Sequence, residues 1–565
     1  MTRRAYPGLA ASRGTALGVL HRVDRPVRAP APEGGVTNEG RAAAAERISC
    51  AFDAVAAHLL DLSRTLHAQG EAEQADIMEV GSLIAQDPAL RDTAVQHARD
   101  GRPAALAVQL AVDAQAATLA GLDDPTLAER AADVRQVGRR ALARLHGAAP
   151  AAAEERPLIL AAHEIGAADL LEPGRKVAAA IAVTGGPNSH AAIVARSLGI
   201  PLLLGVDPAL LDLPDGAEIL LDAGLATAVA GPDDGERTDA LRTIAAAQER
   251  RRQLAVGRQS PAETADGRRI ALRANAATRA DAEAALQANA EGVGLLRTEL
   301  PFLDAESWPS AAQHEAVLGP VLGALRGQVV VARTLDFADD KLPPFLARGR
   351  SGRLGRGLPL MLAQPDAFAD QFRGLLRAGA DTDLRIMIPM VAHVDEVRAC
   401  RALLERAAAH AGVPVPALGI MVELPEAVDG ADELAREADF FSIGSNDLTS
   451  QILGLDRRDQ AATPDLAAHP AVLRAIDRVV RAAHRHNRQV SVCGDAAAQP
   501  LVAPLLVGLG CDSLSVSPAA LDEVRTLIRR LRHDTCVTLA AEAMARRNLD
   551  EVLSLVQRRC ASALA

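Results

Sequence analysis

Polar side chains follow several apolar runs in the second half of the chain, at points where strands would end. Arg297 and Arg333 each follow such a run, Glu423 ends another, and Asn446 with Asp447 follows a fourth. Guanidinium groups bind phosphate and carboxylate oxygens through paired hydrogen bonds, and an Asn amide can donate to a phosphate oxygen. Two carboxylates together with substrate phosphate are a common way to hold Mg²⁺. These residue types predict a magnesium-dependent site for a small phosphorylated acid.

Three further residues extend this set. Cys493 follows the apolar run 490–492 and precedes Gly494; buried packing is the commoner role for a cysteine, but this position favours an acid or a nucleophile. Lys341 and Arg457 add positive charge suited to a phosphate or a carboxylate. Only two of the 61 basic residues are lysines, Lys176 and Lys341. A lysine kept in so arginine-rich a chain marks a position where a compact ammonium matters.

A second segment that could take part in a reaction is Gly-Gly-Pro-Asn-Ser-His at 185–190. It leads into an apolar helical pattern ending at Arg196. Ser189 is a candidate N-cap, which places His190 in the first helical turn. A histidine is most often structural. Here the unpaired backbone N–H groups and the helix dipole would stabilise an anion, and a phosphoryl group on the imidazole would be one.

The elements that position the first group are repeated strand-helix units. Seven strand-like runs alternate with helical patterns from residue 268 onward, at 270–273, 293–296, 329–332, 386–390, 419–423, 440–443 and 490–493. An eighth strand is expected at 358–362 or at 513–517. Such repetition predicts an α/β fold of the TIM-barrel type, with an open doubly wound sheet as the alternative. A barrel would bring the polar residues to one mouth, because the C-terminal ends of its strands meet there.

The first half of the chain has a different pattern. Apolar residues at steps of three and four over 48–66, with further helical stretches at 77–84, 106–122 and 134–145, predict an antiparallel helical bundle. Short apolar runs at 158–162, 177–183, 202–204 and 218–221 predict an α/β unit. A strand-like stretch at 9–20 makes the bundle an insertion into that unit. A charged helix over about 236–254 follows.

Composition excludes several function classes. The chain has 565 residues with a formal net charge of −11, and 2% of its residues are aromatic, which argues against a general nucleic-acid binder. The six cysteines form no C-x-x-C pair, so neither a zinc cluster nor a disulfide framework is indicated. Without a signal peptide or an apolar run of membrane-spanning length, we expect a cytoplasmic protein with no membrane insertion.

Taken together, these segments resemble enzyme I of the bacterial phosphoenolpyruvate-dependent sugar phosphotransferase system. The resemblance runs nearly end to end and rests on ordered motifs at 185–196, 291–299, 333–341, 419–425, 439–449 and 492–497. It implies a phosphohistidine α/β domain at 1–34 and 148–234 and a helical insert at 35–147 that docks the phosphocarrier protein. A linker helix at 235–260 and a phosphoenolpyruvate-binding TIM-type barrel at 261–565, which also mediates a homodimer, complete the expected organisation.

The resemblance also implies a role for each candidate residue. His190 would receive the phosphoryl group of phosphoenolpyruvate and pass it to a histidine of the small phosphocarrier protein, as the first step of sugar uptake. Cys493 would protonate C3 of the enolpyruvate and release pyruvate, and Glu423 with Asp447 would hold Mg²⁺. The residues expected to bind phosphoenolpyruvate are Arg297, Arg333, Lys341, Asn446, Asp447 and Arg457.

The chain departs from the family pattern mildly at Asn188, where threonine is usual, and more strongly in three other places. Ala338 and Asp339 stand where glycines are usual, the segment 354–359 is one residue short and lacks its last arginine, and Asp495 replaces a glutamate. Each change would weaken phosphoenolpyruvate binding, so a divergent regulatory paralogue is one alternative. A relative of pyruvate phosphate dikinase or phosphoenolpyruvate synthase is a weaker alternative, because no Gly-rich ATP-binding loop precedes Pro157.

Overall fold

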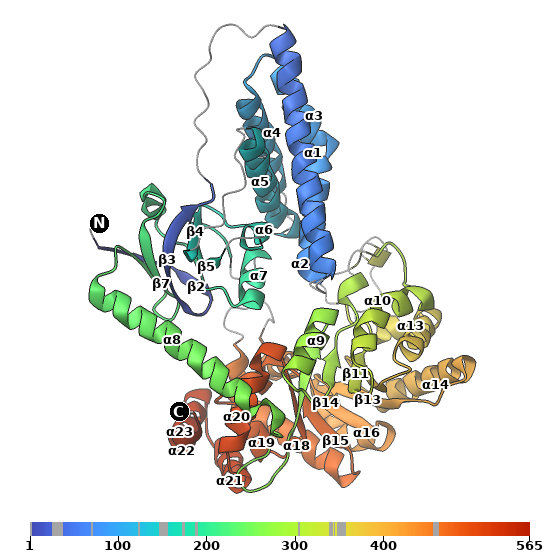
Figure 1. The fold of residues 1–565 in the computed structure, drawn as a ribbon. Helices are drawn as coiled ribbons and strands as arrows, with labels where there is room; N and C mark the ends of the chain where they lie inside the picture. Colours follow the sequence, from blue (N-terminus) through green and yellow to red (C-terminus); the bar gives the residue numbers. More distant parts are fainter. Residues whose placement is uncertain are drawn as a thin grey trace. The chain divides into compact units, whose positions relative to one another are not determined.

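The computed structural model describes residues 3–24, 38–68, 72–121, 125–145, 156–171, 176–186, 190–302, 305–337, 343, 345–346, 357–455 and 463–564. The chain divides into two compact units, 1–250 and 251–565 (Figure 1). Each unit has its own sheet and its own hydrophobic core.

The first unit is built on an eight-stranded sheet in the order β1-β8-β7-β3-β4-β5-β6-β2. Neighbours from β3 through β6 are parallel, and the remaining pairs are antiparallel. The strands are β1 (Arg4–Pro7), β2 (Leu9–Ser12), β3 (Thr15–Arg22), β4 (Leu158–Ala162), β5 (Val177–Ala182), β6 (Leu202–Leu204), β7 (Glu218–Asp222) and β8 (Thr227–Ala230). Because β3 and β4 are parallel neighbours, the helices between them in the chain are an insertion, as the sequence predicted.

Five helices form the insertion: α1 (Asn38–Ala68), α2 (Ala72–Gln86), α3 (Pro88–Arg99), α4 (Ala104–Ala120) and α5 (Pro125–Leu145). The predicted apolar face of α1, including Ile48, Phe52 and Val55, is buried. Helix α3 was not predicted from the sequence. Its start was nevertheless readable, because Asp87 accepts a hydrogen bond from the Ala89 N–H at 2.9 Å and Pro88 occupies the first helical position.

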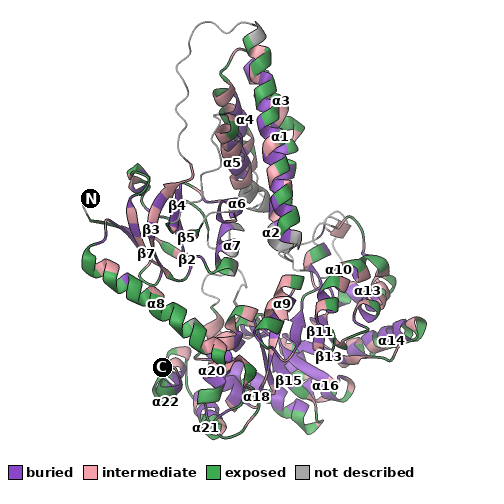
Figure 2. Cartoon of the chain, in the orientation of Figure 1, coloured by how far each residue is buried: buried purple, intermediate pink, exposed green. Residues whose placement is uncertain are grey.

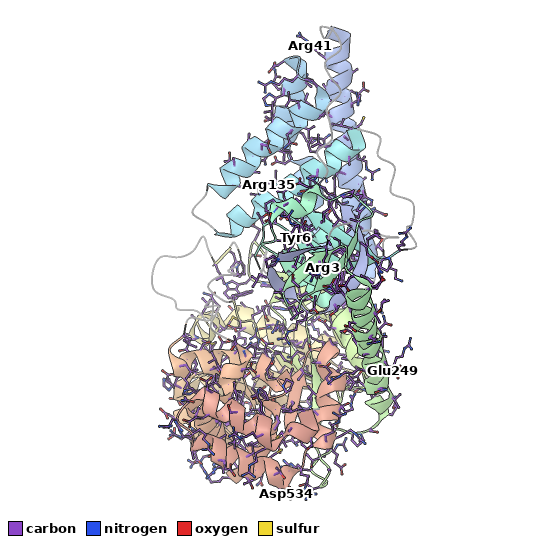
Figure 3. The ribbon with its side chains drawn as sticks, turned by 90° about the vertical axis from the view of Figure 1, so that its left-hand side faces the viewer. Arg3, Tyr6, Arg41, Arg135, Glu249 and Asp534 are labelled. Carbon is purple, nitrogen blue, oxygen red and sulfur yellow. The ribbon has the colours of Figure 1, made fainter. Side chains whose placement is uncertain are left out.

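Three helices and a 3₁₀ turn complete this part of the chain: α6 (Ala167–Leu170), α7 (His190–Leu198), η1 (Pro208–Asp212) and α8 (Asp234–Val256). Helix α8 is the predicted charged helix, and it is exposed along most of its length (Figure 2). Its first turn contacts the start of the sheet, where Arg3 donates to Glu236 at 2.7 Å. Tyr6 of β1, labelled together with Arg3 in Figure 3, is buried in the sheet core.

The second unit is a closed barrel of parallel strands in the order β9-β10-β11-β12-β13-β14-β15-β16. Its strands are β9 (Ala271–Ala276), β10 (Val293–Leu296), β11 (Val329–Arg333), β12 (Asp383–Ile388), β13 (Ala417–Val422), β14 (Phe440–Ile443), β15 (Gln489–Val492) and β16 (Ser513–Val516). The TIM-type barrel is thus confirmed. Of the two proposals for the eighth strand, 513–517 is correct. The proposal for 358–362 is wrong, because Pro359 lacks the N–H that a central strand needs and instead opens a helix after Gly357.

Helices surround the barrel strands (Figure 1). They are α9 (Arg279–Gln287), α10 (Ala311–Ala324), α12 (Leu358–Leu362), α13 (Pro365–Ala378), α14 (Val394–Ala411), α15 (Pro425–Asp429), α16 (Ala431–Glu437), α17 (Ser445–Leu453), α18 (Pro470–Arg485), α19 (Ala503–Gly508), α20 (Leu521–Arg530), α21 (His533–Met544), α22 (Leu549–Arg559) and α23 (Ala561–Leu564). Short 3₁₀ turns are η2 (Gly257–Gln259), η3 (Leu300–Phe302), η4 (Pro464–Ala468), η5 (Asp495–Ala498) and η6 (Pro518–Ala520).

Successive side chains along each barrel strand alternate between two faces, and each face packs into its own core. One set of side chains packs outward against the helices. The opposite set forms a smaller cluster of Leu295, Val331, Met387, Met421, Phe440 and Cys493. Since successive strand residues point to opposite faces, this second cluster lies inside the barrel, on the same face as Arg273, Ser442 and Ser515. Cys493 packs with the apolar members of this cluster close to the mouth.

Candidate active site at the barrel mouth

Five strand ends bring the predicted polar residues to one mouth of the barrel. Arg297 follows β10, Arg333 ends β11, Glu423 follows β13, Asn446 and Asp447 open α17 after β14, and Cys493 follows β15. These strands are parallel in a closed barrel, so their C-terminal ends lie on the same side. The sequence could name these residues individually, and the closed barrel is what makes them neighbours.

Arg333 is held by two carboxylates. Its Nη2 donates to Glu299 Oε1 at 2.6 Å, and its Nη1 lies 3.2 Å from Asp336 Oδ2. Burial by itself would lower the pKa of the guanidinium, but the charges of Glu299, Asp336 and Glu423 outweigh it and raise the pKa. Arg333 is therefore a permanent cation in a defined orientation, which suits recognition of a phosphate or a carboxylate.

Glu423 is a buried carboxylic acid at the same mouth. Only 1% of it is exposed, and its Oε1 accepts a hydrogen bond from the Met390 N–H at 2.7 Å. Met390 adopts a φ of 55°, a left-handed conformation that costs a non-glycine residue energy. Burial raises the pKa of Glu423 to about 8, with further contributions from the negative charges of Asp336 and Asp447. A cation bound beside this carboxyl would favour its ionised form, because an opposite charge stabilises a carboxylate.

The donor set around Glu423 fits a divalent cation such as Mg²⁺. Glu423 Oε2 lies against Gly444, where a Cβ atom would come within 2.8 Å of that oxygen, so glycine leaves room for the carboxylate. Across the described ranges of the chain, no cluster of three or more His, Cys, Asp or Glu side chains could hold a metal. A site made by Glu423 and Asp447 would need substrate oxygens or water to complete it, which is the usual Mg²⁺ arrangement.

Cys493 is buried beside these charges. Its Sγ lies 3.6 Å from the Ile443 carbonyl oxygen, to which the thiol donates. Burial raises the pKa of the thiol to about 11, although the charges of Arg333 and Arg297 lower it in part. Cys493 is therefore a neutral thiol at physiological pH, and a neutral thiol can donate a proton.

Asn446 and Asp495 form a reciprocal pair. Asn446 Nδ2 donates to Asp495 Oδ2 at 2.9 Å, and the Asp495 N–H donates to Asn446 Oδ1 at 3.0 Å. The second bond orients the Asn446 amide, because only its oxygen can accept from a backbone N–H. Asp495, which replaces the family's glutamate, thus positions a residue expected to bind substrate.

His190 is the first residue of α7, so the predicted helical start after the Gly-Gly loop is confirmed. Its side chain is not described, and the predicted N-cap Ser189 lies outside the described residues. Arg196 on the same helix is exposed, and its Nη1 donates to the Ala11 carbonyl at 3.3 Å. Lys341, Arg457, Ala338, Asp339 and residues 354–356 also lie outside the described residues.

The structure adds three residues that sequence reasoning did not single out. Glu299 stands two residues after Arg297, and Asp336 stands three residues after Arg333. Their charges are opposite to those of the arginines, so the sequence could have indicated them as ion-pair partners. Gln371 is fully buried within α13 and contacts the segments after β10 and β11. Nothing in its local sequence distinguishes it from other helical glutamines.

Three family models match the chain in order. They are described as the PEP-utilising enzyme N-terminal domain at residues 7–130, the mobile domain at 154–225 and the PEP-binding domain at 251–533. The last of these contains the barrel mouth described above. Among the described helices, none combines the length and the apolar character needed to cross a membrane.

Curated relatives extend the similarity over the whole chain. A multiphosphoryl transfer protein of Xanthomonas campestris is 36% identical over 98% of this chain, and one of Rhodobacter capsulatus is 36% identical over 85%. The chain spans 67% and 59% of the length of these two relatives. A phosphoenolpyruvate-protein phosphotransferase of Staphylococcus carnosus is 31% identical, with 97% of this chain and 98% of the relative covered.

Proposed function

Because the chain belongs to the phosphoenolpyruvate-protein phosphotransferase family, we propose that it transfers the phosphoryl group of phosphoenolpyruvate to His190 and then to a histidine of a small phosphocarrier protein, releasing pyruvate. The observation that carries the proposal is the gathering of Arg297, Arg333, Glu423 and Cys493 at one barrel mouth. Two guanidinium groups match the phosphate and the carboxylate of this substrate.

The first half-reaction breaks the bond between phosphorus and the enol oxygen. A ring nitrogen of His190 attacks phosphorus, and the electron pair of the broken bond leaves with the enolate of pyruvate. Arg297 and Arg333 stabilise the negative charge of the transferring phosphoryl group and of the substrate carboxylate. The Cys493 thiol donates its proton to C3 of the enolate, which gives pyruvate, and the thiolate regains a proton from water.

Glu423 and Asp447 would hold Mg²⁺, which would add positive charge where charge develops on the enolate and the phosphate. Asn446, oriented by Asp495, would donate its second amide N–H to a phosphate oxygen. Lys341 and Arg457 are assigned to the same substrate site from the family resemblance. The raised pKa of Cys493 supports its role, because the thiol stays protonated until the enolate forms.

The same proposal covers the parts of the chain that the barrel does not include. We assign the phosphohistidine domain to 1–34 and 148–234, the carrier-docking insert to 35–147, the linker helix to 235–260 and the barrel to 261–565. The barrel would also mediate a homodimer, and the protein would work in the cytoplasm as the first step of sugar uptake. Relatives that match from end to end disfavour both a regulatory paralogue and a dikinase-type enzyme.

Incubation with ³²P-labelled phosphoenolpyruvate and Mg²⁺ tests the proposal. We expect acid-labile label on the wild-type protein and release of pyruvate, with no label on the His190→Ala variant. Removal of Mg²⁺ with a chelator should abolish labelling, and its return should restore it. Equal labelling of the wild type and of His190→Ala, or no labelling of either, would refute the assignment.

A further inference from the structure

A buried hydrogen-bond chain joins the two strand ends that carry Arg297 and Arg333. Its members are Thr298, two residues after the end of β10, and Gln371 of α13, and both are fully buried. Gln371 Nε2 donates to Thr298 Oγ1 at 3.1 Å, and the Thr298 hydroxyl donates to the Arg333 carbonyl at 2.7 Å. Gln371 Oε1 accepts from the Leu335 N–H at 3.1 Å. One helical side chain therefore holds both segments.

The direction of every bond in this chain is determined. The Leu335 N–H can only donate, so the atom of Gln371 that faces it is the amide oxygen, and the amide nitrogen faces Thr298. Thr298 Oγ1 accepts from that nitrogen, which directs its own hydrogen to the Arg333 carbonyl. A shift of the segment after β10 or of the segment after β11 would leave a polar group of Thr298 or Gln371 without a partner. This costs free energy because both side chains are fully buried.

The hydrogen bonds of Thr298 and Gln371 lie next to both arginines. Thr298 stands between Arg297 and Glu299, and Glu299 is the carboxylate that orients the Arg333 guanidinium at 2.6 Å. Leu335 is adjacent to Asp336, the second carboxylate partner of Arg333, 3.2 Å away. We infer that Thr298 and Gln371 are positioning residues that set the separation and orientation of Arg297 and Arg333 for the phosphorylated acid, and this inference rests on the function proposed above.

The inference predicts effects on substrate affinity from residues that do not touch the substrate. Two guanidinium groups must match two anionic groups at a defined spacing, and errors near 1 Å can cost up to about 100-fold in rate. Loss of one hydrogen bond of the chain should shift the segment only partly. We therefore expect about a tenfold rise in the KM for phosphoenolpyruvate, with a smaller change in kcat.

Four single variants and one double variant of the full-length protein test this inference. Thr298→Val removes the hydroxyl at nearly constant volume, whereas Thr298→Ser keeps it. Gln371→Met removes the amide at similar length. Thr264→Val is the matched control, since Thr264 is also buried and its hydroxyl donates to Asp266 at 2.6 Å, but it precedes β9 and lies outside the barrel mouth. The measurements are KM and kcat for labelling of His190 by phosphoenolpyruvate, with Trp308 fluorescence to verify that the barrel unit is folded.

The expected result is a raised KM for Thr298→Val and Gln371→Met, and a KM within about twofold of wild type for Thr298→Ser and Thr264→Val. The KM of the double variant Thr298→Val/Gln371→Met should be little higher than that of either single variant, because both substitutions break the same series of hydrogen bonds. A wild-type KM in both Thr298→Val and Gln371→Met, failure of Thr298→Ser to restore the KM, or an equal rise in Thr264→Val would overturn the inference. Should Thr298→Val not fold, Gln371→Met with Thr298→Ser decides in the same way. Absence of labelling in the wild type would instead refute the proposed function, and the inference with it.

Discussion

His314 offers a quantitative test of the buried electrostatics in the barrel unit. The residue lies on α10, is fully buried and packs edge-on against Phe302 with ring centroids 4.7 Å apart. Neither ring nitrogen has a hydrogen-bond partner within the part of the chain that the structure describes. Burial lowers the pKa of His314 to about 4, and the charge of Asp370 opposes this only in part. The imidazole is therefore neutral in the folded protein at any pH above about 4.

The lowered pKa sets both the sign and the size of a pH effect. In the unfolded chain the histidine takes up a proton near pH 6.5, whereas in the folded chain it does so near pH 4. Between these values the unfolded state binds more protons, so acidification favours unfolding. Each pH unit corresponds to 1.36 kcal/mol, so the group removes about 3 kcal/mol of stability as pH falls from 6.5 to 4.

The substitution His314→Leu should remove this contribution, because leucine has a similar volume and does not titrate. The chain contains a single tryptophan, Trp308, which lies in the barrel unit with its ring centroid 4.9 Å from that of Phe345. Urea unfolding followed by Trp308 fluorescence therefore reports on the barrel unit alone. His410→Leu, at an exposed position near the end of α14, is the matched control.

We expect the free energy of unfolding of His314→Leu to fall less steeply than that of wild type between pH 6.5 and 4, with a difference of about 3 kcal/mol across the interval. His410→Leu should keep the wild-type slope. Parallel curves for wild type and His314→Leu would mean that the buried imidazole does not control acid stability, and the reasoning from its burial would be wrong.

Three further predictions concern other sites. Cys493→Ala should slow labelling by phosphoenolpyruvate more than transfer from labelled His190 to the carrier, and equal losses in both steps would contradict its role as a proton donor. Arg333→Lys should lower kcat/KM for phosphoenolpyruvate about 100-fold although the charge is kept, because an ammonium lacks the fork that Glu299 orients; a loss below about threefold would count against the fork. Asp169→Asn should destabilise the first unit by about 1 to 3 kcal/mol, since the buried carboxylate of α6 lies 3.5 Å from two arginines of α5. Calorimetry would detect this change, whereas Trp308 fluorescence should not.

Local pattern was sufficient for most elements of the fold. The barrel strands β10 and β14 have the bounds that their apolar runs predicted, and α8 differs from its predicted range by two residues at each end. Such runs were readable because a strand buried on both faces is continuously apolar. Helix α3 was missed, and the segment 358–362 was wrongly proposed as a strand. The apolar residues of that segment are typical of a buried strand, but Pro359 has no backbone N–H and stands in the first turn of a helix. Hydrophobicity alone does not show whether a residue can make the hydrogen bonds of a strand.

The residue types at the strand ends, and the chemistry that they can support, follow from the amino-acid sequence alone. Arg297, Arg333, Glu423 and Cys493 could each be assigned a role from identity and position, because the C-terminal ends of parallel strands converge in any closed barrel. How these groups affect one another depends on the folded arrangement of the chain. The raised pKa values of Glu423 and Cys493, the carboxylate partners of Arg333 and the Gln371–Thr298 chain all depend on burial and on contacts between segments that are distant in sequence. Burial and distance are properties of the folded chain, and local residue order does not encode them.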